Sequence, residues 1–204
     1  MNIPARNLLF VLAGTLAGFL SGLLVPMVYG VRGAILGAAL SIGAIFLNPR
    51  RKDPDGRGWG PWATAFLALA VGATAFAAIG LWQTIHPTPE NDELGLLYFL
   101  PLPALVACLI YPLALFQFYR EWQAGRRRAW AWFAATPLLG AMARSLGKYG
   151  IAAFPHNLLV GALPFTLLWL LSALIADPAW TKRRRERRAK PRSAATEGET
   201  GPTR

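Results

Sequence analysis

The stretch NLLFVLAGTLAGFLSGLLVP, residues 7–26, contains no charged side chain and decides the fold class. It belongs to a run of 25 uncharged residues between Arg6 and Arg32. A helix needs about 17–25 mostly apolar residues to cross the ~30 Å hydrocarbon core of a membrane, and this run is long enough. A cleaved secretory signal has an apolar core of only about 7–15 residues, so the run predicts an uncleaved first transmembrane helix.

Five further uncharged runs follow this one along the chain. The fifth predicted span is the shortest, because only 15 uncharged residues separate Arg128 from Arg144. It crosses if Arg144 extends its guanidinium toward the headgroups. The sequence therefore predicts an all-α, polytopic integral membrane bundle of about six transmembrane helices. The predicted spans cover residues 7–30, 33–48, 61–83, 94–118, 128–148 and 157–176.

The chain is strongly basic, with a formal net charge of +11 over 204 residues. In a soluble protein that charge would indicate nucleic-acid binding. Here 54% of the residues are hydrophobic and only 15% are charged, against about 25% in ordinary globular domains. The charges also lie in short islands between apolar runs, which is typical of a membrane protein and disfavours a nucleic-acid partner.

The distribution of basic residues predicts the orientation of the bundle. With six spans, 18 of the 21 Lys and Arg residues fall on one side: Arg6, four in 50–57, four in 120–128, and nine after residue 176. Basic loops stay in the cytoplasm, so both termini are predicted to be cytoplasmic. The Ala-, Gly-, Leu- and Arg-rich composition favours a bacterial inner membrane.

Residues 177–204 form a polar, basic tail that we expect to be disordered and cytoplasmic. A basic cluster directly after a transmembrane helix attracts the anionic lipids of the inner leaflet, by about 1 kcal/mol per residue. The tail residues predicted to contact those lipids are Lys182, Arg183, Arg184, Arg185, Arg187 and Arg188.

The first two predicted helices carry small residues at every fourth position. Such spacing lines one helix face and lets two backbones approach closely. With a short turn around Tyr29–Arg32, the two helices are predicted to form a tight antiparallel hairpin. Packing within the chain is the favoured interpretation, and an interface with a second copy or a partner subunit is the alternative. The residues of this predicted helix-packing interface are Gly14, Gly18, Gly22, Gly33, Gly37 and Ser41.

The last three predicted helices carry prolines, each of which removes a backbone N–H and frees the carbonyl four residues earlier. Broken helices near the membrane midplane form the substrate sites of many transporters. Pro101, Pro103, Pro137 and Pro164 are therefore a candidate substrate path, and Pro112 disturbs the carbonyl of Cys108. Because prolines are common in transmembrane helices, a structural kink is the favoured interpretation.

Two small polar groups on the predicted outer side were considered as ligand sites. Arg144 and Lys148 lie four residues apart on one helix face and are a candidate contact for an anionic headgroup, although ordinary snorkelling is favoured. His86 precedes the acidic residues of 90–93, but their spacing matches no metal-binding motif. No metal site and no cofactor is predicted.

Catalytic signatures are weak. No Asp, Glu, Lys or Arg lies deep in a predicted span, and Ser21 lacks a GxSxG elbow. We therefore expect a non-enzymatic accessory, assembly or scaffold subunit of a membrane complex. The alternative is a small carrier for a lipid or neutral solute, built on the proline-broken helices four to six. A water-accessible cavity beside the prolines would favour the carrier, and a filled core would favour the subunit.

Overall fold

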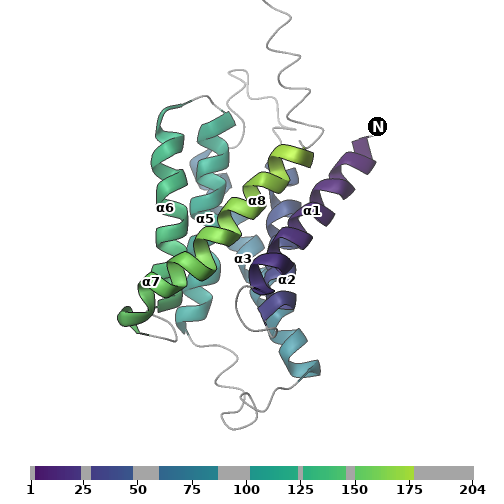
Figure 1. Cartoon of the computed structure of the whole chain (residues 1–204). Helices are drawn as coiled ribbons and strands as arrows, with labels where there is room; N and C mark the ends of the chain where they lie inside the picture. Colours follow the sequence, from purple (N-terminus) through teal and green to yellow (C-terminus); the bar gives the residue numbers. More distant parts are fainter. Residues whose placement is uncertain are drawn as a thin grey trace, which may run out of the picture.

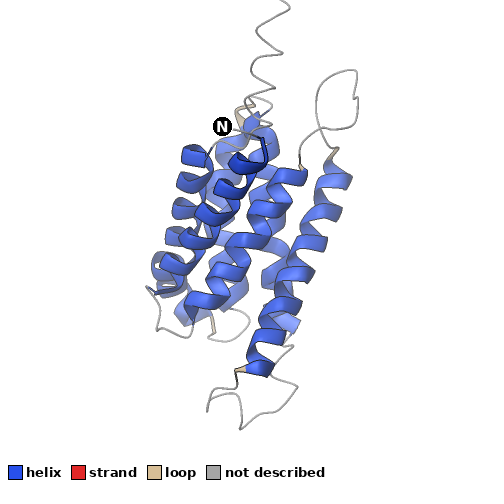
Figure 2. Ribbon diagram, turned by 90° about the vertical axis from the view of Figure 1, so that its right-hand side faces the viewer, coloured by secondary structure: helices blue, strands red, loops and turns tan. Residues whose placement is uncertain are grey.

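The computed structural model describes residues 3–23, 29–47, 60–86, 102–123, 126–145 and 150–176. Across these ranges the regular elements are all helices, and no strand occurs among them. The all-α class predicted from the uncharged runs is therefore confirmed. Figure 2 shows the helices standing side by side along one common direction.

In the described ranges, five long helices are followed by a composite sixth one (Figure 1). The five are α1 (Ile3–Leu23), α2 (Tyr29–Phe46), α3 (Pro61–Ile85), α5 (Leu102–Gln123) and α6 (Arg128–Arg144). The composite helix consists of a 3₁₀ turn (Ile151–Ala153), α7 (Phe154–His156), a π-helical segment (Asn157–Ala162) and α8 (Leu163–Ala176). The most extensive contacts join α1 to α2, α5 to α6, α1 to α8 and α3 to α5.

Three of these helices are long and apolar enough to cross a membrane: 4–23, 61–85 and the composite helix 151–176. A fourth apolar helix, Gly30–Phe46, is shorter. These helices suggest a membrane location for the protein.

Some helix ends differ from the predicted spans. The expected turn at Tyr29–Arg32 is wrong, because α2 already begins at Tyr29 and these four residues form its first turn. α1 is described as far as Leu23, and residues 24–28 of the first predicted span lie outside the described residues. α5 continues past the predicted end at residue 118 to Gln123. α6 begins at Arg128 and α3 at Pro61, the positions given for their predicted spans.

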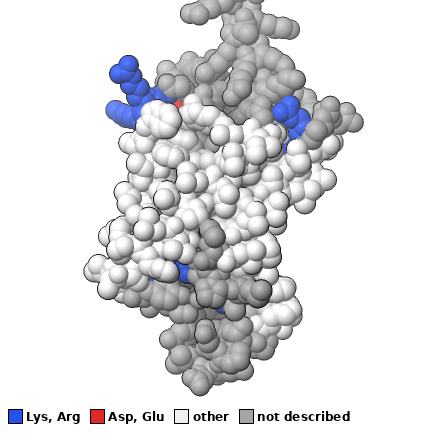
Figure 3. Space-filling view, viewed as in Figure 1, with Lys and Arg blue, Asp and Glu red and all other residues white. Residues whose placement is uncertain are grey.

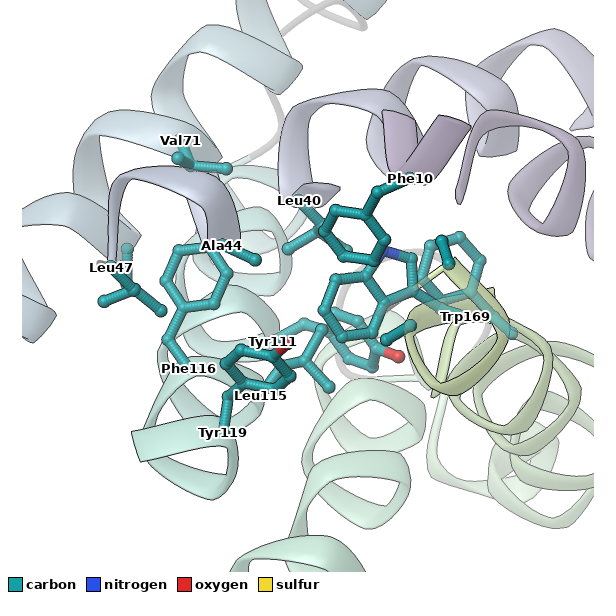
Figure 4. Close-up of a cluster of buried hydrophobic side chains, with 14 residues drawn as sticks. Phe10, Leu40, Ala44, Leu47, Val71, Tyr111, Leu115, Phe116, Tyr119 and Trp169 are labelled. Atoms are coloured by element: carbon teal, nitrogen blue, oxygen red, sulfur yellow. The ribbon is translucent and has the colours of Figure 1, made fainter. Parts of the chain in front are cut away.

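The core lies where α1, α2, α3, α5 and α8 meet (Figure 4). Its centre is the indole of Trp169, which is fully buried and makes edge-to-face contacts with Phe10 (5.8 Å between ring centroids) and Tyr119 (6.1 Å). Edge-to-face pairs are a favourable aromatic geometry. The remaining buried members of this cluster are Leu40, Ala44, Leu47, Ala68, Val71, Tyr111, Leu115, Phe116, Phe165, Ala173 and Ala176.

The outer surface of the bundle is apolar over much of its height. In Figure 3 the face toward the viewer is mostly uncharged between two ends that carry basic atoms. α1 alone exposes seven large apolar side chains: Leu8, Leu9, Leu12, Leu16, Phe19, Leu20 and Leu23. Soluble monomers rarely expose so large a continuous apolar surface, whereas lipid chains cover it without cost. The exposed apolar surface and the lengths of the apolar helices thus both suggest a membrane location.

Candidate functional site

The small-residue faces of α1 and α2 lie directly against each other. A Cβ atom on Gly18 would overlap the backbone carbonyl oxygen of Gly33, and a Cβ on Gly33 would overlap that of Gly18. One turn away, a Cβ on Gly37 would overlap the carbonyl oxygen of Gly14. Gly22 lies at the same contact, its backbone nitrogen 3.6 Å from the position of a Gly33 Cβ. This face is therefore occupied within the chain.

Ser41, the last residue of that face, links the α1–α2 hairpin to α8. Its hydroxyl lies so close to Gly14 that a Cβ there would overlap it. The hydroxyl donates to the Gly37 carbonyl at 2.9 Å and accepts a hydrogen bond from the Trp169 indole Nε1 at 3.1 Å. A buried indole N–H needs such an acceptor, so the Ser41–Trp169 bond fixes the register of α8 against α2.

A second polar contact joins α5 to α8. The Tyr111 hydroxyl lies 2.7 Å from the Thr166 hydroxyl, and Thr166 also donates to the Ala162 carbonyl at 2.6 Å. The Tyr111 ring packs on the face of α6 at Gly140, where a Cβ would come within 2.6 Å of Cδ2. Because each hydroxyl has a partner, these buried groups serve packing rather than holding a ligand.

The structure places most prolines of the predicted substrate path within or at the start of helices. Pro137 and Pro112 are buried inside α6 and α5, and both helices continue through them. Pro103 lies in the first turn of α5, where a missing N–H interrupts no helical bond. Pro164 is the second residue of α8, directly after the π-helical segment. Pro101 lies outside the described residues.

The carbonyl that Pro112 frees is covered by a neighbouring helix. Pro112 cannot donate to the carbonyl of Cys108, and in lipid that oxygen needs another environment. Gly72 of α3 lies over it, so closely that a Cβ on Gly72 would overlap the oxygen. The Cys108 carbonyl oxygen, which lacks its helical partner, therefore faces the backbone of α3 at Gly72.

The candidate headgroup contact is only partly described. The Arg144 guanidinium lies against the π-helical segment, with Nη1 3.0 Å from where a Gly161 Cβ would stand. In the same region the Asn157 amide donates to the Ser145 hydroxyl at 2.9 Å, and both groups are buried. Lys148 lies outside the described residues, as do the tail residues 182–188.

Near the same end of the bundle, the Arg32 guanidinium faces the Gln83 side-chain amide. With the amide oxygen toward Arg32, Nε donates to it at 3.0 Å and Nη1 at 3.2 Å. This contact ties the start of α2 to the last turn of α3.

Glu121 was missed by the sequence interpretation, although it is the only acidic residue within the described ranges. Its side chain is 5% exposed and accepts from Arg120 Nη2 at 2.7 Å and from Arg126 Nη1 at 3.3 Å. The Arg126 backbone N–H also donates to the Glu121 carbonyl at 3.1 Å. A single acid inside the basic stretch YREWQAGRRR was the available signal.

No metal centre is found in the part of the chain that the structure describes, where no three His, Cys, Asp or Glu side chains gather. The His86 ring stacks on that of Trp82, with 3.8 Å between their centroids. The acidic residues of 90–93 lie outside the described residues.

No protein-family model, no curated protein and no solved structure matches this chain.

Proposed function

We propose that this chain is a six-span protein of a bacterial inner membrane with both termini in the cytoplasm. We propose further that it acts as a non-catalytic accessory, assembly or scaffold subunit of a membrane complex.

The orientation is supported by where the basic side chains gather. We call the end of the bundle where α1 begins, α5 ends, α6 begins and α8 ends the basic end (Figure 1). Five of the seven Lys and Arg residues in the described ranges lie there: Arg6, Arg120, Arg126, Arg127 and Arg128. Arg32 and Arg144 belong to the opposite end. Basic residues concentrate on the cytoplasmic side of membrane proteins, so the basic end is assigned to the cytoplasm.

One observation supports the subunit role over the carrier role. A carrier built on broken helices needs its freed carbonyls to line a water-filled cavity or bind a solute. The freed Cys108 carbonyl instead lies under Gly72, and Tyr111, one residue before Pro112, is hydrogen-bonded to Thr166. The cluster of buried side chains where α1, α2, α3, α5 and α8 meet consists of packed aromatic and aliphatic groups.

The test is the composition of the assembly taken from its native membrane. The protein is purified in a mild detergent from the organism that makes it, at its natural abundance, and weighed intact by native mass spectrometry. We expect a discrete complex in which this chain and at least one other polypeptide occur in a fixed ratio. Recovery as a lone monomer, or only as copies of itself, would contradict the accessory role.

A matched control separates partner binding from misfolding. The same chain is produced in an unrelated bacterium that lacks the partner and is purified in the same way. It should retain the helical circular dichroism of the native preparation while losing the other polypeptide. Loss of helicity there would mean that the chain does not fold alone, which would itself point to an obligate partner.

A further inference from the structure

The turn between α5 and α6 concentrates positive charge at the basic end. Within nine residues it carries four guanidinium groups, on Arg120, Arg126, Arg127 and Arg128, and one carboxylate, on Glu121. In Figure 3 the basic atoms project from the upper left of the molecule, beside the acidic atoms visible on this face. The turn therefore carries a net charge of +3.

Glu121 fixes the shape of this turn. It binds the two arginines that flank it, Arg120 on α5 and Arg126 just before α6, and the Arg126 backbone closes back onto the Glu121 carbonyl. The Glu121 side chain is only 5% exposed, so its carboxylate is almost wholly buried beside the two arginines. The carboxylate thus positions two guanidiniums, and among the described residues no acid compensates the charge of Arg127 and Arg128.

Arg127 and Arg128 are exposed, and no acid in the described ranges pairs with them. They also stand at the start of α6, whose first turn has no acidic residue and no side-chain cap. The N-terminal end of a helix carries a partial positive charge, which repels the guanidinium groups of Arg127 and Arg128. A bound anion would be attracted both by this helix end and by the two guanidiniums. The electrostatics of the turn favour a bound anion.

The aromatic residues around the turn indicate what kind of anion it is. Trp122 (39% exposed) and Trp130 (71% exposed) lie on either side of the arginines. Trp130 makes an edge-to-face contact with Phe133 one turn further along α6. Exposed tryptophans are enriched at the headgroup level of membranes, with their rings toward the acyl chains. Further along α6, Leu138 and Met142 are also exposed. Along α6 the arginines are thus followed by Trp130 and then by exposed apolar side chains. A ligand with a phosphate group and acyl chains fits this succession.

We infer that the α5–α6 turn binds the phosphate of an anionic phospholipid of the inner leaflet, with Arg127 and Arg128 as its ligands. Trp130 lies beside the upper part of the acyl chains, and Glu121 holds the turn in shape through Arg120 and Arg126. This inference rests on the proposed membrane orientation, and it assigns other residues than those of the basic tail.

The test uses the full-length protein in uncharged detergent micelles. Binding of phosphatidylglycerol and phosphatidylcholine is measured by native mass spectrometry, with inorganic phosphate as a third probe. The double variant R127Q/R128Q removes the ligands. The double variant R192Q/R204Q removes the same charge from two tail positions outside the predicted lipid contacts and is the matched control. W130A tests the contact with the acyl chains. Thermal unfolding without lipid checks that each variant is folded.

We expect phosphatidylglycerol to bind the wild-type protein and R192Q/R204Q alike, and to bind R127Q/R128Q about 30-fold more weakly. W130A should weaken phosphatidylglycerol binding without changing the response to inorganic phosphate. Equal losses in the two double variants, or equal binding of both lipids, would overturn the site. Displacement of phosphatidylglycerol by millimolar inorganic phosphate, with no effect of W130A, would overturn the lipid assignment. Because the isolated chain is first shown to be folded, loss of lipid binding in a variant is read independently of whether a partner subunit exists.

Discussion

Replacing Trp169 with alanine removes the side chain at the centre of the core. The indole is fully buried between Phe10 and Tyr119, and its N–H donates to Ser41 at 3.1 Å. Truncating a buried Trp or Phe to Ala costs about 3–5 kcal/mol, because packing is lost and a cavity remains. The lost hydrogen bond between α8 and α2 adds about 0.6 kcal/mol inside a membrane protein.

We therefore expect Trp169→Ala to lower the free energy of unfolding by about 4 kcal/mol, close to a thousandfold in the folding equilibrium. The assay is titration of SDS into mild-detergent micelles, followed by the near-ultraviolet circular dichroism of the remaining tryptophans. Trp62→Ala is the matched control, since Trp62 is 87% exposed at the start of α3 and should change stability by no more than about 0.5 kcal/mol.

A further variant separates the hydrogen bond from the packing. Ser41→Ala keeps the indole in place and removes only its acceptor, so its cost should be near 0.6 kcal/mol. If Trp169→Ala and Trp62→Ala unfold at the same SDS concentration, the placement of α8 in the core is refuted.

Three further substitutions test other contacts by the same SDS titration. Gly72→Ala places a Cβ against the Cys108 carbonyl oxygen and should lower the free energy of unfolding by about 1–3 kcal/mol. In Gly80→Ala on the same helix, the new Cβ meets nothing within 4 Å, so this control should be neutral or stabilising. Equal effects of the two variants would refute the packing of α3 on α5. Tyr111→Phe removes the bond to Thr166 and should cost about 0.6 kcal/mol, while no change would place that hydroxyl elsewhere. Glu121→Gln leaves two arginines facing an amide and should cost about 1.5–3 kcal/mol, and an unchanged midpoint would argue against the buried ion pair.

The apolar elements of the fold could be predicted from the sequence because their cause is local. An uncharged run long enough to cross a bilayer specifies a helix whatever its neighbours are. The regular spacing of Gly14, Gly18, Gly33 and Gly37 likewise predicts a face that permits close approach, and the structure pairs these faces within the chain. The spacing of small residues could not show which helix packs on this face. The same small residues permit close packing with a neighbouring helix of the chain or with a helix of a second copy.

The helix ends and the polar contacts could not be predicted because they depend on residues distant in the chain or on pairing. The basic cluster of 120–128 indicated neither that α5 runs on to Gln123 nor that Glu121 is buried in ion pairs with Arg120 and Arg126. The bond between Trp169 and Ser41 joins residues 128 positions apart, and no spacing rule reports it. Prolines identified the freed carbonyl of Cys108, but only the packing of α3 reveals that Gly72 covers it.

The direction in which the bundle crosses the membrane is the central claim, since both proposals depend on it. Cys108 is the only cysteine, so a Cys108→Ser background allows one new cysteine at a time. Arg127→Cys places it at the basic end, and Ile151→Cys places it on an exposed residue of the opposite end. Each is treated with a membrane-impermeant maleimide before and after permeabilisation of the inner membrane. We expect labelling at residue 151 in intact cells and labelling at residue 127 only after permeabilisation. Labelling at 127 in intact cells, or identical behaviour at both positions, would contradict the account.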